Sequence, residues 1–178
     1  KKVEQERSGR AKASQMEHAL RKHITVHLDE DPGFYGPLSE KLEAVIKKYK
    51  DNWDEQAKQL SLLVDEAKTK KPTAEDGVTA KASPFYRALV VKVPDGTKLT
   101  AAETANLKSL CNDLVPLFIE ELQAPGFWNN PVKVSGLQGE VTNRLLYTGV
   151  DIALSNAEPW ARDLVMLAKA RTNDLLAP

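Results

Sequence analysis

The arrangement of the first two helices follows from the stretch Arg21-Lys22-His23-Ile24-Thr25-Val26-His27-Leu28-Asp29-Glu30-Asp31-Pro32. Upstream of it, apolar side chains recur at every fourth position as far as Ile24, which is the spacing of a buried helical stripe. This spacing predicts one long helix over residues 2–27. Asp31 has the short acceptor side chain of a helix N-cap, and Pro32 suits a first helical position, where a missing N–H breaks no hydrogen bond. The stretch therefore predicts two helices joined by a tight turn.

Downstream of this turn, the sequence repeats the combination of a capping residue followed by apolar positions at helical spacing. The residues expected to cap the later helices are Asp51, Ser83, Thr100, Asn130 and Asn156. Thr100 and Glu103 have the spacing of a capping box, in which each side chain satisfies a backbone N–H of the other residue. No stretch alternates apolar and polar residues for long enough to require a sheet. We therefore predict an all-α fold, a helical bundle or array of roughly seven helices.

A break in the helical pattern separates two parts of the chain. Pro72, Gly77 and several small polar residues lie between the third and fourth expected helices. Such residues favour turns and loops over helix. We therefore divide the chain into a helical lobe over residues 1–70, a flexible linker over 71–82 and a second helical lobe over 83–178.

The net charge of zero hides an uneven distribution of charge along the chain. Residues 1–27 carry seven Lys or Arg against three Asp or Glu, and residues 67–98 have the same excess. Residues 28–66 are acidic, with ten acids against five bases, and residues 99–178 have nine against six. Long-range attraction of the whole chain to nucleic acid is therefore not expected, although local basic patches can form. A solvated helix face is the simpler interpretation of each basic segment.

Several classes of protein are disfavoured by what the sequence lacks. It has no apolar run of the roughly 18 to 20 residues that a membrane helix needs. Its single cysteine, Cys111, has no partner for a disulfide and falls within an apolar helical stripe. Residues 1–12 lack the apolar core of a signal peptide, so we expect a cytoplasmic segment cut from a longer protein. With no glycine-rich phosphate loop and no nucleophile elbow, a catalytic site is not expected.

The three histidines, His18, His23 and His27, lie close together in the first expected helix. His23 and His27 are four residues apart, so they share a helix face and are able to bind a metal ion from one side. His18 is rotated away by about 140°. A helical zinc protease would need a glutamate directly after His23, and Ile24 stands there instead. We expect packed histidines without a metal, and keep a metal- or nucleotide-responsive regulatory domain as the alternative function.

The first third of the chain also carries a more specific pattern. Its segments are Met16-Glu17-His18-Ala19, the stretch from Arg21 to Pro32, Phe34-Tyr35, Leu38-Ser39-Glu40-Lys41-Leu42-Glu43 and Asn52-Trp53. Together they resemble the C-terminal region of the motor (restriction) subunit of type I restriction-modification enzymes. The resemblance continues more weakly through Pro84-Phe85-Tyr86 and Trp128, and covers residues 11–150 or so.

In that family the motor subunit joins a nuclease domain and two helicase-like ATPase lobes to a helical region of this kind. The resemblance implies a non-catalytic assembly domain that docks the motor onto the methyltransferase and specificity subunits. By the same resemblance, ATP and Mg belong to the parent subunit, and no cofactor is expected in this chain. Weak, non-specific contact with double-stranded DNA is the implied secondary role, and no membrane partner is expected.

Two sets of residues are candidates for these contacts. Phosphates of the DNA backbone are contacted mainly by Lys and Arg side chains. The candidate cations are Lys12, Arg21, Lys22, Lys68, Lys70, Lys71, Lys133 and Arg144. A small helical bundle is not expected to bury every large aromatic side chain, and exposed aromatic side chains are frequent anchors at interfaces. The aromatic residues expected to contact a protein partner are Phe127, Trp128 and Trp160.

Overall fold

The computed structural model describes residues 2–69 and 75–178 of the chain, with side chains described for residues 8–68 and 75–178. Helices make up 76% of the described residues, and none of these residues forms a strand. The prediction of an all-α fold is therefore confirmed. Seven of the nine α-helices in this part of the chain are seven residues or longer, which agrees with the roughly seven helices expected.

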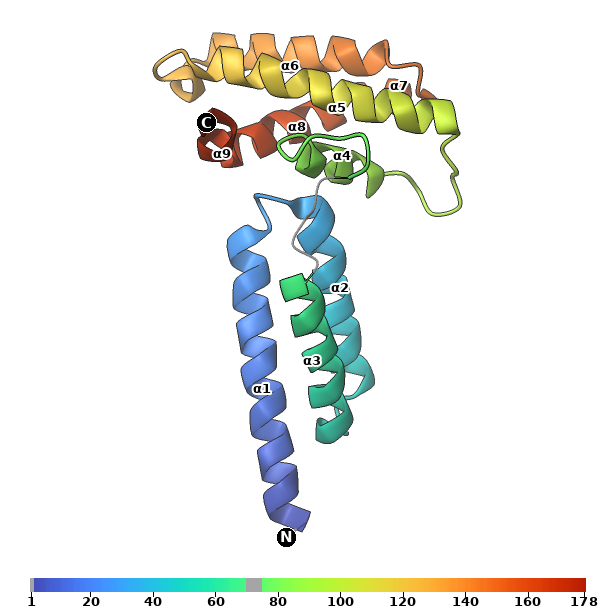
Figure 1. Cartoon of the computed structure of the whole chain (residues 1–178), viewed down its shortest axis with the longest axis vertical. Helices are drawn as coiled ribbons and strands as arrows, with labels where there is room; N and C mark the ends of the chain where they lie inside the picture. The colour runs from blue at the N-terminus through green and yellow to red at the C-terminus, as the bar shows by residue number, and fades with distance from the viewer. Residues whose placement is uncertain (1, 70–74) are drawn as a thin grey trace. The chain divides into compact units, whose positions relative to one another are not determined.

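The chain divides into two compact units, residues 1–72 and residues 73–178, and each has a hydrophobic core of its own (Figure 1). The boundary falls inside the predicted linker. We call them the first unit and the second unit, and describe each by itself.

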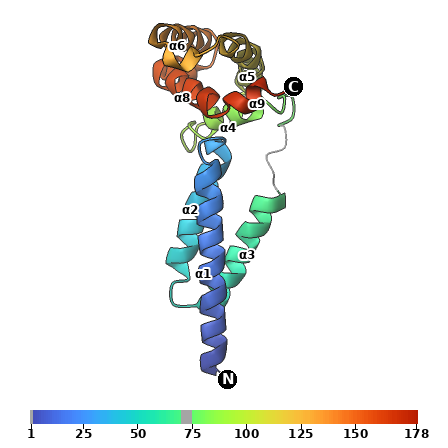
Figure 2. The ribbon, with the colours of Figure 1, turned by 90° about the vertical axis from the view of Figure 1, so that its left-hand side faces the viewer.

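The first unit is a bundle of three helices. They are α1 (Lys2–His27), α2 (Pro32–Lys48) and α3 (Trp53–Thr69). The expected turn between the first two is present, because the Asp31 carboxylate accepts a hydrogen bond from Phe34 N at 3.2 Å and Pro32 opens α2. α1 and α3 run in the same direction, with α2 antiparallel to both (Figures 1 and 2). The core between them contains Leu20, Leu42 and Leu60, which are almost completely buried.

The cap of α3 differs from the prediction. The Asn52 side chain, not that of Asp51, accepts the hydrogen bond from Glu55 N, at 3.2 Å. Asp51 lies one position too early, since an N-cap side chain reaches the N–H two or three residues after it. The first turn of α3 carries Asp54 and Glu55, where the positive end of the helix dipole favours negative charge.

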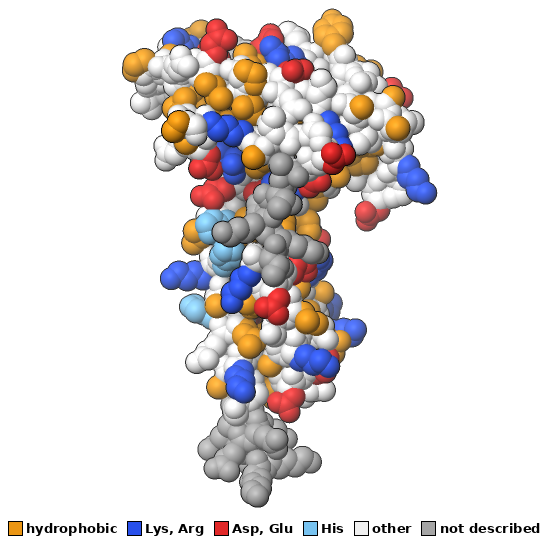
Figure 3. Space-filling model, in the orientation of Figure 1, with side chains coloured by type: hydrophobic (Ala, Val, Ile, Leu, Met, Phe, Trp, Pro, Cys, Tyr) orange, Lys and Arg blue, Asp and Glu red, His pale blue; other side chains and the backbone are white. Residues whose placement is uncertain are grey.

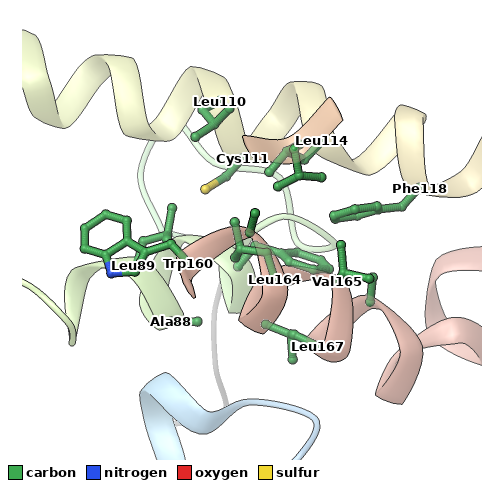
Figure 4. Packing of buried hydrophobic residues seen from close by; sticks show 14 of the residues in the cluster. Ala88, Leu89, Leu110, Cys111, Leu114, Phe118, Trp160, Leu164, Val165 and Leu167 are labelled. Carbon is green, nitrogen blue, oxygen red and sulfur yellow. The ribbon is translucent and has the colours of Figure 1, made fainter. Parts of the chain in front are cut away.

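The second unit contains six α-helices and one 3-10 turn. They are α4 (Ser83–Val90), α5 (Ala101–Leu122), η1 (Phe127–Asn129), α6 (Pro131–Leu146), α7 (Asp151–Ser155), α8 (Ala157–Ala170) and α9 (Thr172–Leu176). α5 and α6 lie side by side, and α8 packs against α6 (Figure 1). Side chains of α5 such as Leu114 and Phe118 face Leu164 of α8, and the rings of Phe118 and Phe85 are 5.1 Å apart (Figure 4).

The second part of the predicted flexible linker is instead an ordered turn of the second unit. Val78 and Ala82 are buried in its core. Asn112 on α5 holds this turn from both sides, because its side chain accepts from Thr79 N at 2.9 Å and donates to the carbonyl of Gly77 at 3.0 Å. Turn-forming residues such as Gly77 and Thr79 do not make this segment flexible, because their backbone groups hydrogen-bond to a side chain of a neighbouring helix.

The predicted caps of the second unit are confirmed in part. Thr100 and Glu103 form the full capping box, and Asn130 accepts from Val132 N and Lys133 N. Ser83 does not cap α4, because its hydroxyl accepts from Glu75 N at 3.0 Å within the preceding turn. Asn156 precedes α8 as expected, but its amide donates to the carbonyl of Ile152 at 2.9 Å and makes no capping bond.

Each unit should respond to truncation of its own core, because the two hydrophobic clusters share no residue. Leu60→Ala in the first unit and Leu114→Ala in the second should each cost about 2–5 kcal/mol, the usual range for a buried leucine. Hydrogen exchange measured by NMR should show amide protection falling only in the mutated unit. Equal loss of protection in both units would show one cooperative fold and contradict the division.

Candidate docking groove and basic surface

The first unit has an apolar groove of about 530 Å³ between α1 and α3. We call it the α1–α3 groove. Its lining residues are Ala19, Leu20, His23, His27, Tyr35, Val64, Ala67 and Lys68. Figure 2 shows the C-terminal end of α3 diverging from α1, which is where these residues lie. On the face drawn in Figure 3, histidine side chains of this unit lie next to hydrophobic and cationic ones.

The wall on α1 follows from its helical spacing. Ala19, His23 and His27 recur at every fourth position, so they stand above one another on one helix face. The turn at residues 28–31 then reverses the direction of the chain. As a result, Tyr35 in the first turns of α2 packs against both histidines. Its ring centroid lies 5.5 Å from that of His23 and 5.6 Å from that of His27, and the two histidine rings are 4.7 Å apart. Tyr35 and Leu20 are buried beneath the groove.

His23 is half-buried and is held by Tyr35 from the neighbouring helix, which agrees with the expectation of a packed histidine. Burial lowers the pKa of His23 below its ordinary value, and the nearby His27 lowers it further. His27 has a different partner, because its Nδ1 lies 2.9 Å from the Glu30 carboxylate in the turn. The two histidines therefore differ in environment although they share a helix face.

Of the predicted DNA-contacting cations in the first unit, Arg21 is already engaged. Its guanidinium donates to Glu17 at 2.9 Å on α1 and also to Glu43 on α2. The hydrogen bonds to Glu43 and Glu17 raise its pKa. Arg21 therefore ties α1 to α2, and contact with a phosphate would require breaking these bonds. The prediction treated it as a free cation, because sequence spacing does not show a carboxylate 22 residues away.

The other predicted cations of this unit remain at the surface. Lys12 and Lys22 are exposed on α1, and Lys68 is exposed on α3 at the edge of the groove. Within the described residues, none of these three lysines forms an ion pair. Lys70 and Lys71 lie outside the described residues.

The two predicted cations of the second unit lie on α6. Lys133 is exposed in its first turn. Arg144 is half-buried, donates to Glu140 at 2.9 Å and also donates to the carbonyl of Asp113 at 3.2 Å. Like Arg21, Arg144 is held by groups of its own unit, so Lys133 is the better candidate for contact with an anion.

The aromatic residues expected at an interface are mostly in the core. Phe127 and Trp160 expose only 3% and 4% of their surface, so the expectation that the bundle leaves them outside is wrong. The second unit is large enough to bury both, because seven helical segments surround one cluster. Trp128 is half-buried, and its indole N–H donates to the Thr172 hydroxyl at 2.9 Å.

Metal ligands and nucleophiles are sparse in the described parts of the chain. No group of three or more His, Cys, Asp or Glu side chains is arranged there to bind a metal ion, so His18 does not complete a site with His23 and His27. Burial raises the pKa of Cys111 to about 12, and a thiol that stays protonated at neutral pH is a poor nucleophile. Among the described helices, none is long and apolar enough to cross a membrane.

The α1–α3 groove is the feature that sequence reasoning missed. Val64 and Ala67 follow Leu60 at helical spacing on α3, and the structure leaves both half-buried at the groove. The run Ala19, His23, His27 was the available signal, since it continues a helical face with small or polar side chains where a core face needs large apolar ones.

Comparisons with known proteins add no relative: no family model, no curated protein and no solved structure matches this chain.

The lowered pKa of His23 predicts a pH-dependent stability of the first unit. Folding lowers this pKa below 6.5, so the unfolded chain binds the proton more readily. The resulting stability is fully present above pH 6.5 and is lost as the pH falls through the folded-state pKa. NMR titration should give a His23 midpoint below 6.5. His23→Gln should reduce the loss of stability on acidification, whereas His18→Gln, at an exposed position of the same helix, should not. A His23 midpoint at or above 6.5 would contradict the assignment.

Proposed function

We propose that this chain is a non-catalytic assembly domain of the motor subunit of a type I restriction-modification enzyme. It docks the motor onto the methyltransferase and specificity subunits in the cytoplasm. ATP and Mg act in other parts of the parent subunit, which supply the nuclease and translocase activities. Contact with the backbone of double-stranded DNA is a secondary role of its exposed lysines.

One observation carries the docking proposal. Half of the residues that line the α1–α3 groove belong to the segments that carry the resemblance: Ala19, His23, His27 and Tyr35. The structure thus gathers them around one concave apolar surface. Because grooves of this kind are common docking sites for other proteins, the coincidence supports an interaction role.

A contact with DNA is supported by fewer residues than expected from the sequence. Lys12, Lys22 and Lys68 are exposed in the first unit, and Arg21 is engaged by carboxylates. Three lysines on one small unit suit contact with a few phosphates and provide no means of reading base edges. The proposed DNA contact is therefore weak and independent of sequence.

The alternative is a regulatory domain that responds to a metal ion or nucleotide. The 4.7 Å approach of the His23 and His27 rings is the observation that favours it. Elemental analysis of the purified chain separates the two functions, because a stoichiometric transition metal that is lost in the His23→Ala variant would support the alternative. The assembly function requires no metal.

The docking proposal predicts the effect of removing the first unit. A full-length motor subunit that lacks residues 1–72 of this chain should fail to form a complex with the methyltransferase core in size-exclusion chromatography. The second unit should stay folded, because each unit has a core of its own. ATP hydrolysis by the shortened subunit checks that its ATPase lobes stay intact. A shortened motor subunit that assembles as tightly as the intact one would refute the proposal.

The DNA proposal predicts a steep dependence on salt. If Lys12, Lys22 and Lys68 neutralise three phosphates, counterion release should weaken binding by about 40-fold between about 50 and 200 mM salt. Charge reversal of all three to Glu should remove most of this dependence, equally for unrelated sequences. The control reverses three other exposed lysines of the first unit, Lys47, Lys48 and Lys50. Affinity that does not change with salt, or that depends on sequence, would contradict a phosphate contact.

A further inference from the structure

We propose that the α1–α3 groove binds an amphipathic helix that carries a carboxylate beside its apolar face. This inference rests on the proposed docking function, and assigns the groove to a helix of the methyltransferase core.

The lining of the groove is suited to apolar side chains. Its apolar members are Leu20, Tyr35, Val64 and the methyl groups of Ala19 and Ala67. Its volume of about 530 Å³ lies in the range of pockets that bury a whole small ligand, and so admits several side chains. An occupant must therefore present a cluster of apolar groups.

The shape of the groove favours a helix over an extended chain. Its two walls are rows of helical residues, Ala19, His23 and His27 on α1 and Val64 with Ala67 and Lys68 on α3. The two helices run in the same direction, and the C-terminal end of α3 diverges from α1 (Figure 2). The groove lies between them at this end. Side chains at every third or fourth position of an incoming helix fit between such rows. The alanine on each wall also permits close approach of a helix backbone.

The charges around the groove indicate which charge its occupant carries. Lys68 is the one lining side chain with a full charge, and it forms no ion pair within the described residues. The nearby carboxylates already have partners: Glu30 contacts His27, and Glu66 pairs with Lys41 at 2.8 Å. A groove with a lysine at its edge and no acid among the described side chains that line it favours an occupant with an Asp or Glu beside its apolar residues.

The test measures binding of the 178-residue chain to the purified methyltransferase core by calorimetry. Ala19→Glu places a carboxylate in the groove at an exposed position, where folding tolerates it, and should weaken binding by about tenfold or more. Lys68→Glu should weaken binding by about fivefold, less so at high salt, while Lys68→Arg retains it. The matched controls are Leu62→Glu, 57% exposed on α3 outside the groove, and Lys58→Glu on the same helix. Circular dichroism must show that every variant keeps its helix content.

A photo-crosslinking residue at Ala19 identifies the occupant. Mass spectrometry should map the crosslink to a helix of the core that has Asp or Glu next to apolar residues. A crosslink to an extended loop or to a basic segment would overturn the inference. Groove variants that bind as tightly as the wild-type chain would also overturn it, while the docking function stands. If the wild-type chain does not bind the core at all, both proposals fall.

Discussion

Parallel packing of α1 on α3 is the interaction on which the first unit depends. Leu20 and Ile24 on α1 meet Leu60 and Leu63 on α3 within one buried cluster, and this contact fixes how far apart the two helices lie. The groove lies where the C-terminal end of α3 diverges from α1, and the small side chains of Ala19 and Ala67 line it. The turn at Asp31 then sets Tyr35 against His23 and His27. The hydrophobic core of the first unit and the α1–α3 groove are therefore both formed by the packing of α1 against α3.

The two units differ in how completely they bury their large apolar side chains. The second unit encloses its aromatic residues, as shown by Phe127 and Trp160, and leaves few of the expected contact residues at its surface. The first unit is thin, and its three helices cannot enclose every apolar side chain. This physical difference explains why the proposed interaction surface lies on the first unit.

Much of the fold was predictable because local rules determine it. The bounds of α1, the Asp31 cap and the capping box at Thr100 depend on residues within a few positions of one another. The ordered turn at Val78 was not predictable in this way, because Asn112 holds it from 33 residues away. Contacts between residues far apart in the sequence also decide which of the candidate cations are free. Arg21 looked like a free cation until folding brought Glu43 beside it. The helical spacing of apolar residues identifies the faces of each helix. Which of these faces stays exposed depends on tertiary packing.

The central claim, that the first unit docks a partner through the α1–α3 groove, is tested most directly by hydrogen–deuterium exchange. The chain is compared alone and in complex with the methyltransferase core. The account predicts slower exchange in residues 16–35 and 60–68, which contain both walls of the groove, with little change in the second unit. Protection confined to residues 75–178, or to the face of α2 away from the groove, would contradict it.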